Sequence, residues 1–274
     1  MTPVKPIQPR QPAVAGLFYP ADPAELRTLV DKLLNAESVG SSPAPKALIA
    51  PHAGYVYSGP VAAKAYARLR PVRERIQRVV LLGPSHRVPL QGLAYSTADA
   101  FQTPLGSIPV DRAALASLQD LPQVRPLDQA HAQEHSLEVH LPFLQAQLQA
   151  FSLVPLVVGD ASAEAVCAVL ERLWGGPETL LVISSDLSHY HDYRTAQAID
   201  QTTCHTIEAL RGQDINYEQA CGRVPLQGLL LAAQHHHLQV ETLDLRNSGD
   251  TAGPRHQVVG YGAWALHETA HVST

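Results

Sequence analysis

The segment ALIAPHAGYVYSG, residues 47–59, joins a short apolar run to a cluster of His, Gly, Tyr and Ser. The same pattern recurs as VVLLGPSHRVP at 79–89, LVPLVVGD at 153–160 and TLLVISSDLSHYHDY at 179–193. Runs this apolar are typical of strands that are buried on both faces of a sheet. The sequence therefore predicts at least four central strands, each followed by a polar loop.

Helical periodicity fills the stretches between these runs, at residues 23–36, 60–70, 136–149, 161–173, 193–210 and 226–236. Asp22 is a plausible N-cap for the first of these helices. Two further segments indicate antiparallel strands, namely 92–98 and the pair 240–246 with 257–265. Strands that alternate with helices predict an α/β three-layer sandwich around a central mixed, largely parallel sheet. We expect one domain over residues 1–274, with the proline-rich residues 1–20 as an extended N-terminal arm.

Composition excludes several classes of protein. Lys and Arg number 20 against 25 Asp and Glu, and a net charge of −5 argues against binding nucleic acid through bulk charge. The three cysteines form no CxxC pair, which excludes a disulfide scaffold and fits a reducing compartment. The first residues lack the apolar core of a signal peptide, and no apolar run is long enough to cross a membrane. We expect a cytoplasmic protein with no nucleic-acid or membrane partner.

The chain holds 14 histidines, and three of them follow predicted strands: His52, His86 and His189. Asp186 precedes His189 by three residues. Loops at the carboxyl ends of parallel strands meet at one edge of the sheet, where ligands bind. Imidazole and carboxylate are ligands for Fe(II), Zn and Mn, so this pattern predicts a metal pocket. The alternative is that each histidine only stabilises a turn in its loop.

Longer motifs carry a resemblance to a known family. They are PAVAGLFYP, PHAGYVYSGPVAAKAY, LLGPSHRVPL, TPLG, EHSLEVHLPFL, SSDLSHY, CGR, and NSGD followed by VVGYGAWAL. In this order they resemble the Memo family, also called AmmeMemoRadiSam system protein B, over nearly the whole chain. The resemblance implies a fold like that of the class III extradiol dioxygenases, with a related metal pocket.

The resemblance also implies roles for individual residues. His52 and His86 correspond to metal ligands, while Asp186 and His189 line the same pocket. His189 occupies the position of the dioxygenases' acid–base histidine, which makes these two the candidate catalytic residues.

The third metal ligand is the point at which this sequence departs from the family. Animal members have a cysteine there, and counting back from the tyrosine of the last strand places Thr251 at that position. A threonine hydroxyl is a poor ligand, so we predict that neighbouring Asp250 completes the metal site. The alternative is that Asn247 to Gly249 form a turn that Asp250 caps.

Five further residues are candidates for the edge of the pocket. Glu134 and His135 lie in a loop that the resemblance places beside it, where they can orient a ligand imidazole. Tyr55 and Tyr57 can bind a phenol or peroxide, or equally belong to the core. His191 lies in the pocket or at its rim.

Other polar groups have simpler interpretations. Ser136 is a plausible N-cap, and Glu138 is then a favourable anion in the first turn. Cys221 is expected to be buried as a small hydrophobic residue. The run HHH at 235–237 ends a predicted helix, where imidazoles usually face solvent.

Together these features favour a mononuclear non-haem iron oxygenase or redox enzyme that acts on an unknown small molecule. Fe(II) is the favoured divalent metal, with Cu or Zn as alternatives. A second hypothesis is a non-catalytic module that binds phosphotyrosine-like or peptide ligands in the same pocket. A third, implied by the family name, is a partner of radical-SAM and AMMECR-type proteins.

Overall fold

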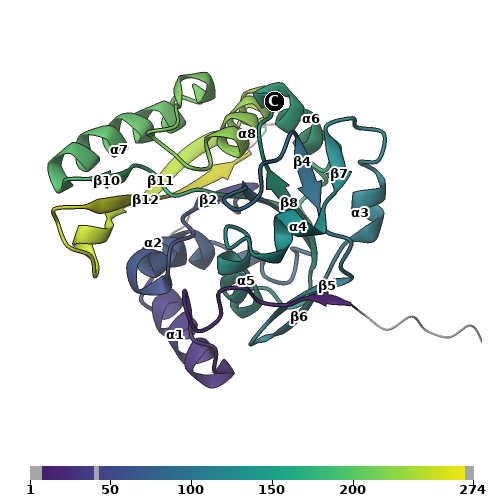
Figure 1. The fold of residues 1–274 in the computed structure, drawn as a ribbon, viewed down its shortest axis with the longest axis horizontal. Helices are drawn as coiled ribbons and strands as arrows, with labels where there is room; N and C mark the ends of the chain where they lie inside the picture. The colour runs from purple at the N-terminus through teal and green to yellow at the C-terminus, as the bar shows by residue number, and fades with distance from the viewer. Residues whose placement is uncertain (1–7, 40–42, 269–274) are drawn as a thin grey trace, which may run out of the picture.

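A nine-stranded mixed sheet forms the centre of the computed structural model, which describes residues 8–39 and 43–268 (Figure 1). The strand order is β10-β12-β2-β9-β3-β8-β4-β7, and β11 also pairs with β12. The strands are β2 (Ala47–Ala50), β3 (Arg78–Pro84), β4 (Leu93–Tyr95), β7 (Val124–Pro126), β8 (Ser152–Val158), β9 (Thr179–Ser184), β10 (His189–His191), β11 (Gln239–Asn247) and β12 (Val258–His267).

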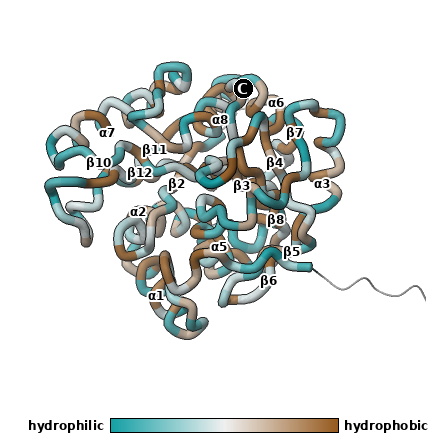
Figure 2. The backbone as a smooth tube through the Cα atoms, viewed as in Figure 1, coloured by the Kyte–Doolittle hydropathy of each residue, from teal (hydrophilic) through white to brown (hydrophobic). Residues whose placement is uncertain are grey.

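The four strands predicted from their apolar runs are the parallel centre of this sheet. β2 pairs with β9, β9 with β3, and β3 with β8, all in parallel. Residues 79–82 and 180–183 have no exposed surface, and hydrophobic colour is concentrated at β3 in Figure 2. The two predicted antiparallel segments are also confirmed, because β4 runs antiparallel to β8 and β11 to β12. The fold is therefore the expected α/β architecture with a mixed sheet, although this sheet is parallel in only half of its pairings: four strand pairings are parallel and four are antiparallel.

Helices cover both faces of the sheet, with α7 and α8 on one face and α2 on the other (Figure 1). The helices are α1 (Pro23–Asn35), α2 (Tyr55–Ala67), α3 (Arg112–Ala116), α4 (Asp128–Ala132), α5 (Leu141–Gln147), α6 (Ala163–Arg172), α7 (Tyr193–Glu208) and α8 (Arg223–His235). Short 3-10 helices lie at Arg70–Val72, Glu138–His140, Gly212–Asp214 and Ser248–Asp250. No helix within the described ranges has both the length and the apolar character needed to cross a membrane.

Helix boundaries follow the caps more closely than the apolar pattern. Asp22 caps α1 as predicted, because its carboxylate accepts hydrogen bonds from the backbone N–H groups of Ala24 and Glu25. The helix predicted from residue 136 is instead divided into the 3-10 turn Glu138–His140 and α5. Pro142 is the reason, since proline fits the first turn of an α-helix and not its interior.

The described part of the N-terminal arm is bound along the body of the protein. β1 (Pro9–Arg10) pairs in parallel with β5 (Ala100–Thr103), which in turn pairs with β6 (Gly106–Pro109). The buried Glu138 carboxylate accepts hydrogen bonds from the backbone N–H groups of Ala13 and Val14 and from the Tyr19 hydroxyl, and it forms an ion pair with Arg10. Glu138 thus anchors this arm and, as expected, it also lies in the first turn of a helix, the 3-10 helix Glu138–His140. Residues 1–7 lie outside the described ranges.

Candidate metal centre

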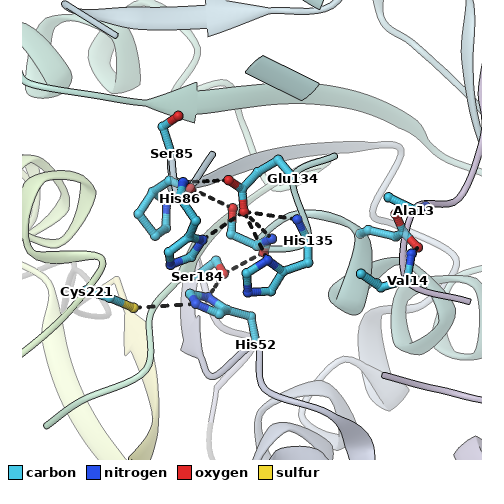
Figure 3. Close-up of polar contacts among 12 residues, drawn as sticks. Ala13, Val14, His52, Ser85, His86, Glu134, His135, Ser184 and Cys221 are labelled. Carbon is cyan, nitrogen blue, oxygen red and sulfur yellow. Dashed lines mark hydrogen bonds and ion pairs between the residues drawn. The ribbon is translucent and has the colours of Figure 1, made fainter. Parts of the chain in front are cut away.

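Three imidazoles converge at the carboxyl ends of the central strands (Figure 3). His52 follows β2, His86 follows β3, and His135 lies between α4 and the 3-10 helix Glu138–His140. We call these three residues the histidine cluster. Their ring centroids are 4.6–5.3 Å apart, and one nitrogen from each ring lies within 4.8 Å of the other two. The shared strand edge therefore brings His52 and His86 together as predicted, and His135 joins them from another part of the chain.

His135 is held at the cluster because the next residue, Ser136, packs closely against the end of β3. The Ser136 hydroxyl donates a hydrogen bond to the carbonyl of Pro84 at the end of β3, and the Ser136 carbonyl accepts one from the Ser184 hydroxyl at the end of β9. A Cβ atom added to Gly83 would lie 2.7 Å from the Ser136 hydroxyl, so only glycine leaves room for this contact. Ser136 is thus a link between two strands, and it is not the helix cap that was expected.

Hydrogen bonds fix the tautomer of His52. Its Nδ1 lies 2.5 Å from the Ser184 hydroxyl, which already donates its one proton to the Ser136 carbonyl. The hydroxyl must therefore accept from Nδ1–H, and the lone pair of His52 is on Nε2. The Cys221 sulfur lies 3.4 Å from this Nε2 (Figure 3), and its thiol donates to the backbone carbonyl of Asp186. Burial, followed by the charges of the neighbouring histidines, lowers the pKa of His52 well below its usual range. His52 is neutral and offers Nε2 as a ligand atom.

Glu134 orients His86 in the same way. The His86 Nδ1–H donates to Glu134 Oε1 at 2.8 Å, which leaves the lone pair on Nε2. The carboxylate also accepts the backbone N–H groups of His86, His135 and Ser136 at 2.6–2.9 Å. Burial opposes ionisation of Glu134, but these hydrogen bonds and the His86 charge outweigh it and lower its pKa to about 2. A buried, ionised carboxylate behind a ligand imidazole is the arrangement found at many metal sites.

The third imidazole has an unused buried nitrogen. His135 Nδ1 makes no hydrogen bond in the described part of the chain, although Glu134 Oε1 lies 3.4 Å away. Burial, with the nearby His86, lowers the pKa of His135 to about 4, so this ring is also neutral near pH 7. Neutral imidazole suits Fe, Zn, Cu and Ni. The donor set and the unpartnered nitrogen both fit a divalent metal ion.

The histidine cluster forms part of the wall of a cavity of about 850 Å³. Aromatic side chains supply much of the remaining lining: Phe18, Tyr57, Tyr190, Tyr217 and Tyr261. A cavity of this size and lining accommodates a small aromatic molecule.

The two predicted catalytic residues also line this cavity. Asp186 is buried, and its Oδ1 accepts a hydrogen bond from the backbone N–H of His52 at 2.8 Å. Burial raises the pKa of Asp186 against the opposing effects of His189 and of that hydrogen bond. His189 lies on β10. The carboxylate thus holds the His52 backbone, and the described contacts include no hydrogen bond from it to the His189 ring.

Asp250 lies apart from the histidine cluster. Its carboxylate accepts hydrogen bonds from the Tyr193 hydroxyl at 2.5 Å and from the backbone N–H of Asn247 at 3.1 Å. Asn247 and Asp250 form a reciprocal capping box around the 3-10 turn Ser248–Asp250, which is the alternative that the sequence left open. The neighbouring Thr251 hydroxyl donates to the carbonyl of Ser248. The structure therefore brings neither Asp250 nor Thr251 to His52 and His86, because local turn contacts already engage both side chains.

The remaining candidates separate into core and cavity. Tyr55 belongs to the core, where its hydroxyl donates to the carbonyl of Val139. Tyr57 is 39% exposed and lines the cavity. His191 is not part of the cavity lining, whereas Tyr190 is. Tyr190 has a φ of +63° at an irregularity in the pairing of β10 with β12, which breaks the usual alternation and lets both His189 and Tyr190 reach the cavity.

Sequence reasoning missed three features of the site. It gave His135 an orienting role, although the ring centroid of His135 is 5.3 Å from that of His52, nearly as close as the 5.1 Å between His86 and His52. It treated Cys221 as a small core residue, although the thiol contacts His52. It also missed a groove of about 440 Å³ that contains Arg223 and shares His86, Arg87, Tyr217 and Cys221 with the cavity. The EHSLEVHLPFL motif gave a sequence signal for His135, and the CGR motif gave one for Cys221 and Arg223.

Comparison with known proteins gives consistent matches over most of the chain. The family model described as Memo-like protein matches residues 10–265. A MEMO1 family protein from Aquifex aeolicus is 37% identical over 92% of this chain and 97% of the relative. One from Methanopyrus kandleri is 36% identical over 93% and 97%. The crystal structure of the uncharacterized protein JW3007 from Escherichia coli K12 has a similar fold, with a TM-score of 0.50 and 13% identity over 80% of this chain and 98% of that one.

Proposed function

The chain belongs to the Memo-like family, and we propose that its histidine cluster holds one divalent metal ion, with Fe(II) favoured, in an oxidoreductase that acts on a small phenolic molecule. The observation that carries this proposal is the convergence of three imidazoles, two with the lone pair on Nε2 and one with an unpartnered nitrogen. Bound iron would supply Lewis acidity and the ability to combine O₂ with an electron-rich ring.

The protein's own residues divide the remaining tasks. Glu134 and Ser184 hold the rings of His86 and His52 by accepting hydrogen bonds from Nδ1. The aromatic side chains that line the cavity can stack against a phenol ring. His189 faces the same cavity, and a histidine can exchange the phenolic proton near neutral pH. Asp186 keeps the backbone of His52 in place.

Metal binding is the first test. The protein, stripped of metal and incubated without oxygen with Fe(II), is expected to retain about one equivalent at this site, as measured by metal analysis after dialysis. His135→Ala should lose that equivalent, while His205→Ala, at an exposed histidine of α7, should not. Retention of the metal by His135→Ala would exclude this residue as a ligand and favour another group of the cavity wall.

Activity is the second test. The iron-loaded protein is expected to consume O₂ with at least one member of a catechol panel, as followed with an oxygen electrode. His189→Gln should keep the metal and lose turnover, because glutamine cannot exchange a proton near pH 7. No oxygen consumption by the metal-loaded protein across the panel would remove the oxygenase reaction, although the metal site would remain.

The groove beside the cavity favours a second candidate, a module that binds a phosphotyrosine-like ligand. Arg87 and Arg223 both line it, and the Arg223 guanidinium stacks on the ring of Tyr217 at 3.4 Å. Arginine is the usual partner of phosphate groups. Calorimetric titration with a phosphotyrosine peptide tests this candidate, and Arg223→Met should weaken any binding that uses it. A cytoplasmic location and radical-SAM or AMMECR-type partner proteins remain predictions.

A further inference from the structure

A second group of potential metal ligands lies between α6 and α8. Cys167 and Glu171 are four residues apart on one face of α6, and His235 is the last residue of α8. One ligand atom from each residue lies within 4.8 Å of the other two. Cys167 is almost fully buried, whereas the His235 side chain is 54% exposed. The group therefore combines a buried thiol with a position that solvent can reach.

The distances between these atoms match those around a tetrahedral zinc ion. With bonds of about 2.3 Å to sulfur and about 2.1 Å to nitrogen or oxygen, tetrahedral ligands lie about 3.6 Å (S to N) and about 3.4 Å (N to O) apart. Cys167 Sγ is 3.8 Å from His235 Nδ1, and this nitrogen is 3.1 Å from Glu171 Oε1. Only small side-chain shifts are needed to place all three around one ion.

Close packing of the two helices makes this arrangement rigid. A Cβ atom added to Gly228 of α8 would lie 2.4 Å from the side chain of Val166 and 3.2 Å from the backbone nitrogen of Cys167. Glycine is thus required where α8 meets α6. His235 follows Gly228 by seven residues, or about two helical turns, and so projects from the same face of α8. The helix contact itself brings His235 to Cys167.

A neighbouring histidine orients the carboxylate. His236 Nε2 contacts Glu171 Oε2 at 2.7 Å, which leaves Oε1 directed at His235. The His236 ring stacks on Trp174 with centroids 3.6 Å apart and planes 8° apart. His235 and His237 are exposed, as expected for the run 235–237, whereas His236 is only partly exposed and packs on Trp174. The contact of His236 with Glu171 resembles the hydrogen bonds that hold ligands in place behind a metal.

We propose that Cys167, Glu171 and His235 bind a zinc ion, with a water molecule as the fourth ligand. A thiolate, an imidazole and a carboxylate are all common zinc ligands, and the thiolate favours zinc over Mg²⁺, Ca²⁺ and Mn²⁺. On binding, the Cys167 thiol releases its proton to solvent and the sulfur bonds to the metal. Because the ligands come from both α6 and α8, the ion would join the two helices.

This second site is separate from the histidine cluster. Cys221 and Arg223, at the start of α8, adjoin the cavity, and His235 lies at the other end of this 13-residue helix. At about 1.5 Å per residue, the helix separates the two sites by roughly 18 Å. The proposal therefore stands whether or not the histidine cluster binds metal.

Metal binding by a full-length variant that lacks the first site provides the test. In the His52→Ala/His86→Ala protein, stripped of metal, one equivalent of Zn²⁺ is expected to remain bound after dialysis. Co²⁺ should replace it and give the near-ultraviolet absorption of a cobalt–thiolate bond. Cys167→Ser in this background should abolish that absorption, while Cys204→Ser should leave it unchanged. Cys204 is a matched control, since it is also buried and lies on α7 outside the group.

A second variant, at an exposed position, tests the proposal even if Cys167→Ser fails to fold. His235→Ala changes an exposed side chain, and it should weaken Zn²⁺ binding at least tenfold without loss of the folded structure. The proposal is overturned if the His52→Ala/His86→Ala protein binds no Zn²⁺, if Cys167→Ser keeps the cobalt–thiolate absorption, or if His235→Ala binds Zn²⁺ as tightly as its parent.

Discussion

Glu134→Gln should weaken metal binding at the histidine cluster through a residue that does not bind the metal. The Glu134 carboxylate accepts four hydrogen bonds, three at Oε1 and one at Oε2. A glutamine can place its carbonyl oxygen at the Oε1 position and keep three of them. Its NH₂ group then faces the backbone N–H of His86, which is also a donor, and one buried hydrogen bond is lost.

The size of the effect follows from these contacts. His86 Nδ1–H would donate to a neutral oxygen, so Nε2 becomes a poorer electron donor to a metal. Losses of this kind weaken metal binding by about 10- to 100-fold, or about 1.4 to 2.7 kcal/mol. The unpaired N–H should also lower the free energy of unfolding of the metal-free protein by about 1–3 kcal/mol.

A second buried glutamate in the same segment provides the control. Glu138 also accepts several hydrogen bonds, but from the N-terminal arm and Tyr19 rather than from the histidine cluster. Glu138→Gln should therefore reduce stability in urea denaturation without changing the dissociation constant for Fe(II), measured without oxygen by competition with a chelator of known affinity. The reasoning is refuted if Glu134→Gln binds Fe(II) as tightly as the unmodified protein, or if both variants lose affinity equally.

Three further predictions concern stability, and urea denaturation measures all of them. Burial is the main cause that lowers the pKa of His131 to about 4 and of His140 to about 3. As the pH falls below about 6.5, these two histidines therefore become protonated in the unfolded chain while they stay neutral in the folded protein. The free energy of unfolding should fall by about 1.4 kcal/mol per pH unit for each histidine between pH 6 and 4.5, and His131→Gln should remove one such contribution; parallel pH curves for variant and parent would contradict this. Gly228→Ala should cost about 1–3 kcal/mol, because the new methyl group would overlap Val166, and an unchanged denaturation midpoint would argue against the tight α6–α8 contact. Asp22→Ala should cost about 1 kcal/mol through loss of the α1 cap, whereas Asp22→Asn, which keeps an acceptor oxygen, should cost less.

Local patterns in the chain predicted much of the fold. Strands buried on both faces have to be apolar throughout, so β2, β3, β8 and β9 stand out in the sequence. Parallel strands share a carboxyl edge, and for this reason the nearness of His52 to His86 could be inferred without coordinates. The cap at Asp22 is equally local, because it depends only on the next three residues.

Other contacts depend on how distant segments pack. His135 reaches the cluster because Gly83 admits Ser136 against β3, and no spacing rule connects residues 83 and 136. Asp250 lies next in the chain to the position expected for a ligand, yet its oxygens bond to Asn247 and Tyr193. The sequence alone could offer a turn or a ligand at that position, and the structure shows the turn.

The sequence by itself determined the order of the strands along the chain, the apolar faces they bury and the edge at which the polar loops gather. Only the tertiary structure decided which side chains at that edge meet, and which ones bond to their neighbours instead. The physical reason is the separation in sequence of the residues that interact. Strand patterns and helix caps depend on a few neighbouring residues, whereas a metal centre needs atoms from distant loops, which the packing of the whole core brings within a few ångströms of one another.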